Sequence, residues 1–492
     1  MGAINHVFVL MLENRSFDHM LGASGIRGND AVTGQPTSIN GFQGNESNSY
    51  QGVIYKPQAP ADYSMTVGPG HEFPDVYTQL TGTAGPYDPT VPYPTINNSG
   101  YVANFAASGG QQNPGDVMKY FGPGQLPVLT ALANEFVVCD NWFSSLPGPT
   151  WPNRFFMLGG SSAGLDHSPS TAEMIEWEGI DGFKFQHGSI FQQNLWWRIY
   201  AGGDFCLAQA LKGINFADIT PFPRFARDVS AANYPVQFTL IEPNYGHVAS
   251  DYKGGNSQHP LDDVANGEAL IKSVYETIRN SPAWNTSLLI ITWDEHGGFY
   301  DHTAPPAAVA PGDAAQLDSA NKYQFTFQQY GPRVPAIVVS PLIPANVIDH
   351  RLYDHTSVPA TVEAAFRLSS MTQRDAKANN LLSLISLTTA RAGAPTSLPA
   401  PVNLTAAEHV VDAAAFALPA PPVTRPAAPV DEDKNMPGFL YVAMRTDLDL
   451  SPLSQRPAIL ARVAAIRTRD EARTYTESVR QKVHAARAKA LD

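Results

Sequence analysis

Apolar runs of strand length that stop abruptly at polar clusters recur along this chain. Residues 288–292 (LLIIT) form one such run, and residues 6–12 (HVFVLML) form another. Continuous apolar and β-branched runs of this length are typical of strands buried on both faces of a parallel sheet. Because apolar residues between the runs have helical spacing, we expect an α/β fold with a mostly parallel central sheet flanked by helices. Further strands are predicted at residues 137–139, 237–241 and 333–340, and helices at 125–136, near 190–200, around 270–278 and up to 366, whereas 22–101 are expected to be long loop insertions.

Two of these runs end in acidic residues, at what we expect to be one edge of the sheet. Asp294 and Glu295 follow the first run, and Glu13 and Asn14 follow the second. In open α/β sheets, ligands bind beyond the carboxyl ends of the strands, where such side chains emerge. Adjacent carboxylates on a regular strand point to opposite faces, but the glycine pair that follows breaks the strand and lets both acids face one point. A solvated turn, or Asn14 acting as a helix cap, is the alternative that the residues leave open.

The loop at residues 144–154 (SSLPGPTWPNR) is stiff in composition. It holds three prolines and one glycine, and each proline fixes its own φ and removes a hydrogen-bond donor. A rigid loop of this kind is suited to holding one hydroxyl in a fixed place, and Thr150 is that hydroxyl. A tightly packed turn is the alternative.

These residues together favour a metal-activated nucleophile. Glu13, Asp294 and Glu295 would bring three carboxylates together with no Lys or Arg expected nearby, so they would repel one another and stay partly protonated. A divalent cation removes that repulsion. All-oxygen ligation, with Asn14 and Thr150 as neutral oxygens, favours Ca²⁺ or Mg²⁺, with Mn²⁺ as a further option. An ion at Thr150 would lower the pKa of the hydroxyl, and nearby histidines could bind phosphoryl oxygens and protonate the leaving group.

Composition narrows the class of protein. A hydrophobic content of 43% and a charged content of 16% over 492 residues describe a globular protein with a large core. The net charge of −13 argues against a general nucleic-acid binder. Cys139 and Cys206 have apolar neighbours, so we interpret both as buried small hydrophobes rather than as a disulfide.

The sequence shows no targeting segment. No apolar run approaches the ~20 residues that span a bilayer. Residues 7–12 are too short for a signal peptide and lack its basic flank and cleavage site. We therefore expect no Sec signal and no transmembrane segment, and a cytoplasmic location and export by a non-Sec route both stay open.

Four ordered motifs resemble the marker motifs of the phosphoesterases of bacteria, fungi and plants. That family joins phosphatidylcholine-preferring and non-specific phospholipases C with an acid phosphatase branch. The resemblance runs from residue 4 to about residue 366, and it implies an alkaline-phosphatase-like fold and a phosphoryl-enzyme intermediate. The motifs are ENRSFD at 13–18, PGPTWPNR at 147–154, EPN at 242–244 and WDEHGGFYDH at 293–302.

The resemblance also implies roles for individual residues. Thr150 falls at the position of the nucleophile, where it would bridge the metal and the phosphorus. The metal ligands implied are Glu13, Asn14, Thr150, Asp294 and Glu295. The residues implied to bind the phosphoryl group are His71, His259 and Asn153, with His247 and then His296 as looser matches, while Asp301 and His302 could instead be supports behind the ligands.

The reaction that this resemblance favours is that of a phospholipase C. Such an enzyme cleaves the glycerol–phosphate ester of phospholipids, phosphatidylcholine among them, to diacylglycerol and a phosphorylated head group. An acid phosphatase that uses the same site is the alternative, and a metal-stabilised binding protein without activity is the hypothesis from another class. The expected partners are a phospholipid or other phosphate ester and, transiently, a membrane surface, but no nucleic acid.

Composition divides the chain into three predicted parts. Residues 1–390 carry all the motifs and form the predicted catalytic domain, 391–437 form an Ala/Pro-rich arm, and 438–492 form a mildly basic helical segment. We expect the stripe of Ile459, Val463 and Ile466 to pack on the body of the protein. Contact of a basic amphipathic helix with an anionic membrane is the alternative.

Overall fold

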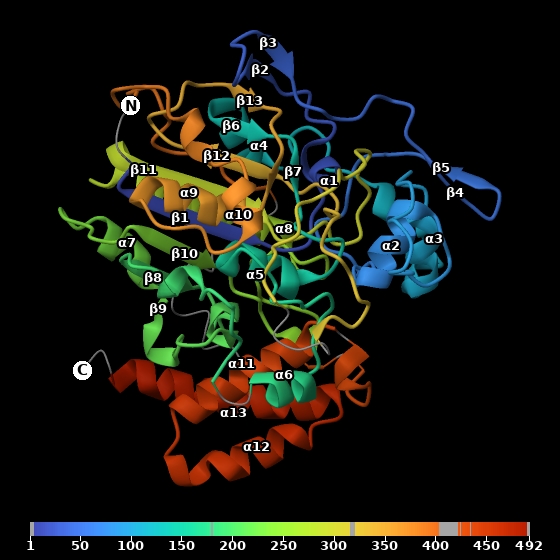
Figure 1. Ribbon diagram of the computed structural model, residues 1–492, viewed down its shortest axis with the longest axis vertical. Coiled ribbons are helices and arrows are strands. Elements are labelled where there is room, and N and C mark those ends of the chain that lie inside the picture. Colours follow the sequence, from blue (N-terminus) through green and yellow to red (C-terminus); the bar gives the residue numbers. More distant parts are fainter. Residues whose placement is uncertain are drawn as a thin grey trace.

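A ten-stranded mixed sheet forms the centre of the molecule (Figure 1). The computed structural model describes residues 4–178, 181–314, 320–402, 422–423, 425–432 and 434–489. Neighbouring strands of the sheet run parallel except where β12 lies between β11 and β6, and where β2 pairs with β3. The predicted α/β architecture with a mostly parallel central sheet is therefore confirmed.

The strands of this sheet are, in spatial order, β3 (Pro36–Ser38), β2 (Arg27–Asp30), β13 (Val347–Asp349), β6 (Val137–Cys139), β12 (Ala336–Val339), β11 (Ser287–Trp293), β1 (His6–Leu12), β10 (Phe238–Glu242), β8 (Trp197–Ala201) and β9 (Ile219–Pro221). Two small two-stranded sheets pair β14 (Tyr353–Asp354) with β7 (Trp142–Phe143), and β4 (Asn48–Tyr50) with β5 (Val53–Tyr55). The β4–β5 hairpin projects from the body of the molecule (Figure 1).

The two central strands, β1 and β11, end level with each other. They pair in parallel register from His6 opposite Ser287 to Leu12 opposite Trp293. Every residue of β11, and all of β1 after His6, is buried. Burying an aliphatic side chain of this size contributes about 1.5–3 kcal/mol, so the apolar runs hold these strands at the centre of the core. The residues that follow Leu12 and Trp293 are consequently neighbours in space.

Thirteen α-helices in the described part of the chain surround the sheet and its loops (Figure 1). They are α1 (Phe17–Leu21), α2 (Phe73–Thr81), α3 (Tyr101–Phe105), α4 (Pro127–Glu135), α5 (Thr150–Gly159), α6 (Thr171–Glu178), α7 (Phe225–Val229), α8 (Val264–Arg279), α9 (Ser357–Phe366), α10 (Gln373–Lys377), α11 (Met436–Asp449), α12 (Arg456–Ala464) and α13 (Arg469–Lys489).

Two predictions of local structure are wrong. Residues near 190–200 form a short 3₁₀ turn and then strand β8, because the aromatic and β-branched residues of β8 pair with β10 instead of forming a helix. Residues 22–101 contain helix α2, which begins at Phe73. Its first turn is fixed by a proline and by Asp75, whose carboxylate accepts a hydrogen bond from the Glu72 backbone N–H at 3.2 Å.

The C-terminal helices α11, α12 and α13 lie together at one end of the molecule (Figure 1). Ile459, Val463 and Ile466 are buried in the main core, so the prediction that this stripe packs on the body is confirmed. The central residues of the predicted Ala/Pro-rich arm, 403–421, lie outside the described residues. Both cysteines are buried and neither forms a disulfide, as predicted. In the part of the chain that the structure describes, no helix combines the length and apolarity needed to cross a bilayer.

Candidate active site

Four predicted site residues converge where β1 and β11 end. The backbone N–H of Asn14 donates to Asp294 Oδ1 at 3.0 Å, and the same oxygen accepts from the Glu295 N–H at 2.8 Å. Asn14 has a left-handed backbone with φ 58°, and Gly297 follows on the other strand with φ 67°. An ideal Cβ on Gly297 would lie 2.1 Å from the Asn14 carbonyl oxygen, so only glycine permits this approach of the two loops. The predicted turn after β11 is therefore present.

Several oxygens of this acidic cluster lack hydrogen-bond donors. Glu13 Oε1 and Oε2, Asn14 Oδ1 and Glu295 Oε1 are buried and accept no hydrogen bond of normal geometry from a described residue, although the Ser257 hydroxyl lies close enough to Glu13 to lower its pKa slightly. Burial raises the pKa of Glu13 well above its usual range, and the charge of Arg154 offsets this only in part. Buried oxygens without donors cost free energy, typically about 1–3 kcal/mol each and more when charged. Oxygen is the ligand type that a hard cation prefers, although among the described residues it is Asp18, Asp301 and His302 that bring three ligand atoms within 4.8 Å of one another.

Arg154 corrects one premise of the sequence analysis, which expected no cation near the three carboxylates. Its Nε donates to Asp294 Oδ2 at 2.9 Å, and its Nη2 donates to the Leu12 carbonyl oxygen at 2.9 Å. Burial raises the pKa of Asp294 to about 6, against the opposing charge of Arg154. One of the three carboxylates is thus paired by an arginine, and the other two are not.

Helix α5 carries Thr150 into this region. Thr150 is its first residue, is fully buried, and precedes Arg154 by one helical turn. Residues four apart lie on the same face of a helix, so Thr150 lies on the face of α5 that contacts Asp294. The N-terminal end of a helix also favours negative charge, because its first backbone N–H groups point outward.

The predicted rigid loop before Thr150 is held by Asn153. The side-chain amide of Asn153 donates to the carbonyl oxygens of Gly148 at 2.9 Å and Pro149 at 3.0 Å, and its oxygen accepts from the Leu146 N–H at 3.2 Å. These contacts fix the loop, and the predicted role of Asn153 in binding the phosphoryl group stays a prediction.

His71 and His259 form a pair beside the acidic cluster. Their ring centroids are 6.5 Å apart, and His71 Nε2 lies 3.4 Å from Asn14 Nδ2. Burial lowers the pKa of His71, but the charges of Glu295 and Glu72 outweigh this, so the net shift is upward. Burial, together with the charges of His71 and Arg15, lowers the pKa of His259 well below its usual range. The pair therefore combines one imidazole that favours the charged form with one that favours the neutral form.

The two looser histidine candidates have other contacts. His247 lies against helix α13, where its Nδ1 is 3.3 Å from Glu477 Oε1 and its ring contacts Arg480. His296 Nε2 is 2.7 Å from Gln79 Oε1 in α2. These contacts give both histidines a role in docking helices, and a role of either in binding phosphate stays a prediction.

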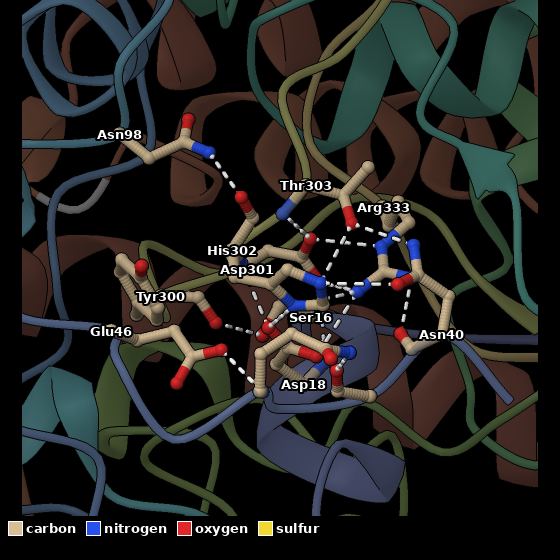
Figure 2. Close-up of polar contacts among 12 residues, drawn as sticks. Ser16, Asp18, Asn40, Glu46, Asn98, Tyr300, Asp301, His302, Thr303 and Arg333 are labelled. Atoms are coloured by element: carbon tan, nitrogen blue, oxygen red, sulfur yellow. Dashed lines mark hydrogen bonds and ion pairs between the residues drawn. The ribbon is translucent and has the colours of Figure 1, made fainter.

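Asp301 and His302 belong to a second polar cluster, with Asp18 and Arg333 (Figure 2). Arg333 Nε donates to Asp301 Oδ1 at 2.8 Å, and its Nη2 donates to Asp18 Oδ1 at 3.0 Å. His302 Nδ1 is 2.7 Å from Asp18 Oδ2. An acidic and histidine group that could hold a metal is therefore present here in geometry, but an arginine already neutralises it.

Sequence reasoning missed three residues of the site: Arg154, His355 and Asn435. His355 Nε2 donates to the backbone carbonyl oxygen of Asp294 at 2.5 Å, and burial lowers the pKa of His355 to about 4. Asn435 Nδ2 lies 3.4 Å from Thr150 Oγ1. Arg154 could have been found, because it lies within a quoted motif and four residues after Thr150.

The chain belongs to the Phosphoesterase family, whose model matches residues 4–369. It is 36% identical to non-specific phospholipase C6 of Arabidopsis thaliana, over 84% of this chain and 78% of that protein. It is 32% identical to non-specific phospholipase C3 of the same plant, over 80% and 76% of the two chains. It is 27% identical to phospholipase C B of Mycobacterium tuberculosis, over 74% and 73%.

Among solved structures, the chain resembles a protein in the alkaline phosphatase superfamily from Vibrio parahaemolyticus. The TM-score is 0.28 at 12% identity, over 54% of this chain and 64% of that one. A similarity with this TM-score supports no conclusion about fold or function. The α/β architecture is established by the central sheet itself.

Proposed function

We propose that this member of the Phosphoesterase family is a phospholipase C that hydrolyses the glycerol–phosphate ester of phospholipids. The products are diacylglycerol and a phosphorylated head group. The names of the three relatives support this choice of reaction. The observation that carries the chemistry is the group of buried acceptor oxygens on Glu13, Asn14 and Glu295 at the ends of two adjacent strands.

These oxygens fit one divalent cation. Glu13, Asn14, Asp294 and Glu295 offer only oxygen ligands, which is the preference of Ca²⁺ and Mg²⁺ and is accepted by Mn²⁺. Thr150, the first residue of α5, completes the proposed ligand set. When bound, such an ion supplies a positive charge that lowers the pKa of a neighbouring hydroxyl and stabilises phosphoryl oxygens.

Thr150 is the proposed nucleophile. Its Oγ1 attacks phosphorus, the bond from phosphorus to the glycerol oxygen breaks, and the glycerol oxygen receives a proton as diacylglycerol leaves. Water then attacks the phosphothreonine, so that the phosphorylated head group is released and the Thr150 hydroxyl is restored. His71 and His259 are the proposed groups that hold phosphoryl oxygens and transfer the proton, because they lie together beside Asn14.

Transient contact with a membrane surface is part of this proposal. The β4–β5 hairpin projects from the body and exposes Val53 and Ile54, whose relative exposures are 52% and 67%. Tyr50, which pairs with Val53 beside the turn, and Tyr55, which pairs with Asn48 at the base, pack against a small buried cluster. The hairpin therefore offers a supported apolar tip to lipid.

Thr150→Ala tests the proposal. Purified parent, Thr150→Ala and a control, Thr130→Ala in α4, are assayed on p-nitrophenyl phosphate, p-nitrophenylphosphorylcholine and phosphatidylcholine vesicles, with and without a chelator. We expect diacylglycerol from vesicles with the parent and the control, and a loss of roughly 10³-fold or more with Thr150→Ala.

Other outcomes would select another function. Release of phosphate from the monoester alone would favour an acid phosphatase. Turnover that survives in Thr150→Ala would remove Thr150 from the mechanism. A folded parent that binds metal but turns over none of the three substrates would favour a binding protein.

A further inference from the structure

Helix α11 brings an amide to the proposed nucleophile from outside the matched region. The family match ends at residue 369, whereas Asn435 directly precedes α11. Asn435 Nδ2 lies 3.4 Å from Thr150 Oγ1, and both residues are buried. An amide nitrogen is a donor only, so the Thr150 oxygen is the acceptor in this contact.

The start of α11 is fixed against α5 by close packing. The ring of Phe439 meets the ring of Trp151 edge-on, at a centroid distance of 6.0 Å. Gly438 lies so close to Trp151 that an ideal Cβ there would be 2.2 Å from the indole ring. Trp151 follows Thr150 directly, so the contact that seats α11 is adjacent to the contact made by Asn435.

The far half of α11 is anchored separately. Arg445 Nη1 donates to the carbonyl oxygen of Leu211 at 2.8 Å, and Gln209 Nε2 donates to Thr446 Oγ1 at 3.2 Å. Tyr475 of α13 donates to Asp447 Oδ2 at 3.1 Å. With both ends of the helix held, the Asn435 amide keeps a defined position relative to Thr150.

We propose that Asn435 is a catalytic residue, whose amide N–H stabilises the Thr150 oxygen as it acquires negative charge. This inference rests on the proposed role of Thr150 as nucleophile. A hydrogen bond to an ionised acceptor is shorter and about twice as strong as one to a neutral acceptor, and the buried setting strengthens it further. The hydrogen bond from Asn435 is therefore stronger when the Thr150 oxygen carries negative charge than when Thr150 is a neutral hydroxyl. An interaction that strengthens on the way to the transition state lowers the activation barrier.

Asn435→Ala and the isosteric Asn435→Asp test the inference on p-nitrophenylphosphorylcholine, beside Thr150→Ala and the parent. We expect kcat to fall about 10- to 100-fold in Asn435→Ala with KM within about twofold of the parent, as for loss of one donor at a reacting oxygen. Asn435→Asp should lose at least as much, because it keeps the shape but replaces a donor with an anion. Lys434→Ala, an exposed change on the same segment, is the matched control and should retain parental kcat.

Gly438→Ala provides an independent variant. Its new methyl group would push α11 away from Trp151, so kcat should fall although Asn435 is unchanged. Parental kcat in both Asn435 variants would overturn the inference, as would a fall that only matches a lowered melting temperature and a smaller folded fraction. If Thr150→Ala kept its turnover, the proposed function would fail instead, so the two failures are distinguishable.

Discussion

Two acidic clusters follow strands β1 and β11, and they differ in whether an arginine neutralises their carboxylates. Glu13 and Glu295 lie within two residues of the ends of β1 and β11, whereas Asp18 lies in α1 and Asp301 lies further along the segment after β11. In the second cluster Arg333 donates to both aspartates (Figure 2). In the first cluster Arg154 pairs only with Asp294, while Glu13 and one Glu295 oxygen accept no hydrogen bond of normal geometry from described residues.

We infer from this difference that the second cluster is structural, and it supports the proposal that the first cluster binds the metal. A buried carboxylate whose oxygens meet an arginine and backbone N–H groups is satisfied, and its burial stabilises one loop geometry. Buried carboxylate oxygens without donors lower the stability of the folded protein, so their presence calls for an explanation such as ligand binding. The distribution of donors around the acids, and not the number of acids alone, therefore distinguishes the two clusters.

The largest effect is expected from removing one acid of the first cluster. Glu13→Gln should lose its bound divalent ion and roughly 10³-fold in kcat/KM, because the carboxylate charge contributes to holding the ion. The measurement is metal content by elemental analysis after gel filtration, together with turnover. Asp301→Asn is the matched change in the second cluster and should retain the metal. Loss of metal from Asp301→Asn but not from Glu13→Gln would reverse the assignment.

The next largest effect is expected from breaking the second cluster. Arg333→Met should lower the free energy of unfolding by about 3–5 kcal/mol, because it leaves two buried carboxylates without their cation. Urea denaturation at neutral pH measures this. Arg227→Met, which removes a partner of Asp228 from an exposed pair, should cost under about 1 kcal/mol. Equal costs for the two arginines would show that burial of the cluster does not matter.

A chelator should affect the parent and Glu13→Gln differently. Removing an ion present at about 100 times its dissociation constant should cost the parent about 2.7 kcal/mol, which appears as a lower melting temperature. Glu13→Gln should not respond. In chelator it should be at least as stable as the parent, because burial already favours the neutral form of Glu13. A parent melting temperature that ignores the chelator would contradict the assignment of the cation to this cluster.

The smallest effect concerns pH and His302. Burial lowers the pKa of His302, but the hydrogen bond and charge of Asp18 outweigh this and raise it. A histidine whose pKa is higher in the folded than in the unfolded state stabilises the folded protein. This stabilisation is complete below the unfolded-state pKa of about 6.5 and is lost as the pH rises through the folded-state pKa. The melting temperature of His302→Gln should therefore fall below that of the parent by ~1–2 °C at pH 6, and by less at pH 9. A gap that widens with pH would reverse the sign of the linkage.

The sequence predicted the sheet and the acidic cluster better than it predicted the partners of that cluster. β1 and β11 were predictable because an uninterrupted apolar run buried on both faces leaves few other structures. The contacts of Arg154 with Asp294 and of Asn435 with Thr150 join residues 140 and 285 positions apart. Such contacts depend on how α5 and α11 dock, which no local periodicity encodes. The contacts of His247 with α13 could not be predicted for the same reason.

The position of α11 has a consequence for biosynthesis. Residues 13, 150 and 294 emerge from the ribosome well before residue 435, and the early strands can pair as they appear. If Asn435 completes the pocket at Thr150, a nascent chain stays without full hydrolytic capacity until α11 has been translated and has docked on Trp151. Completion of the pocket late in translation would delay attack on the cell's own phosphate esters during synthesis.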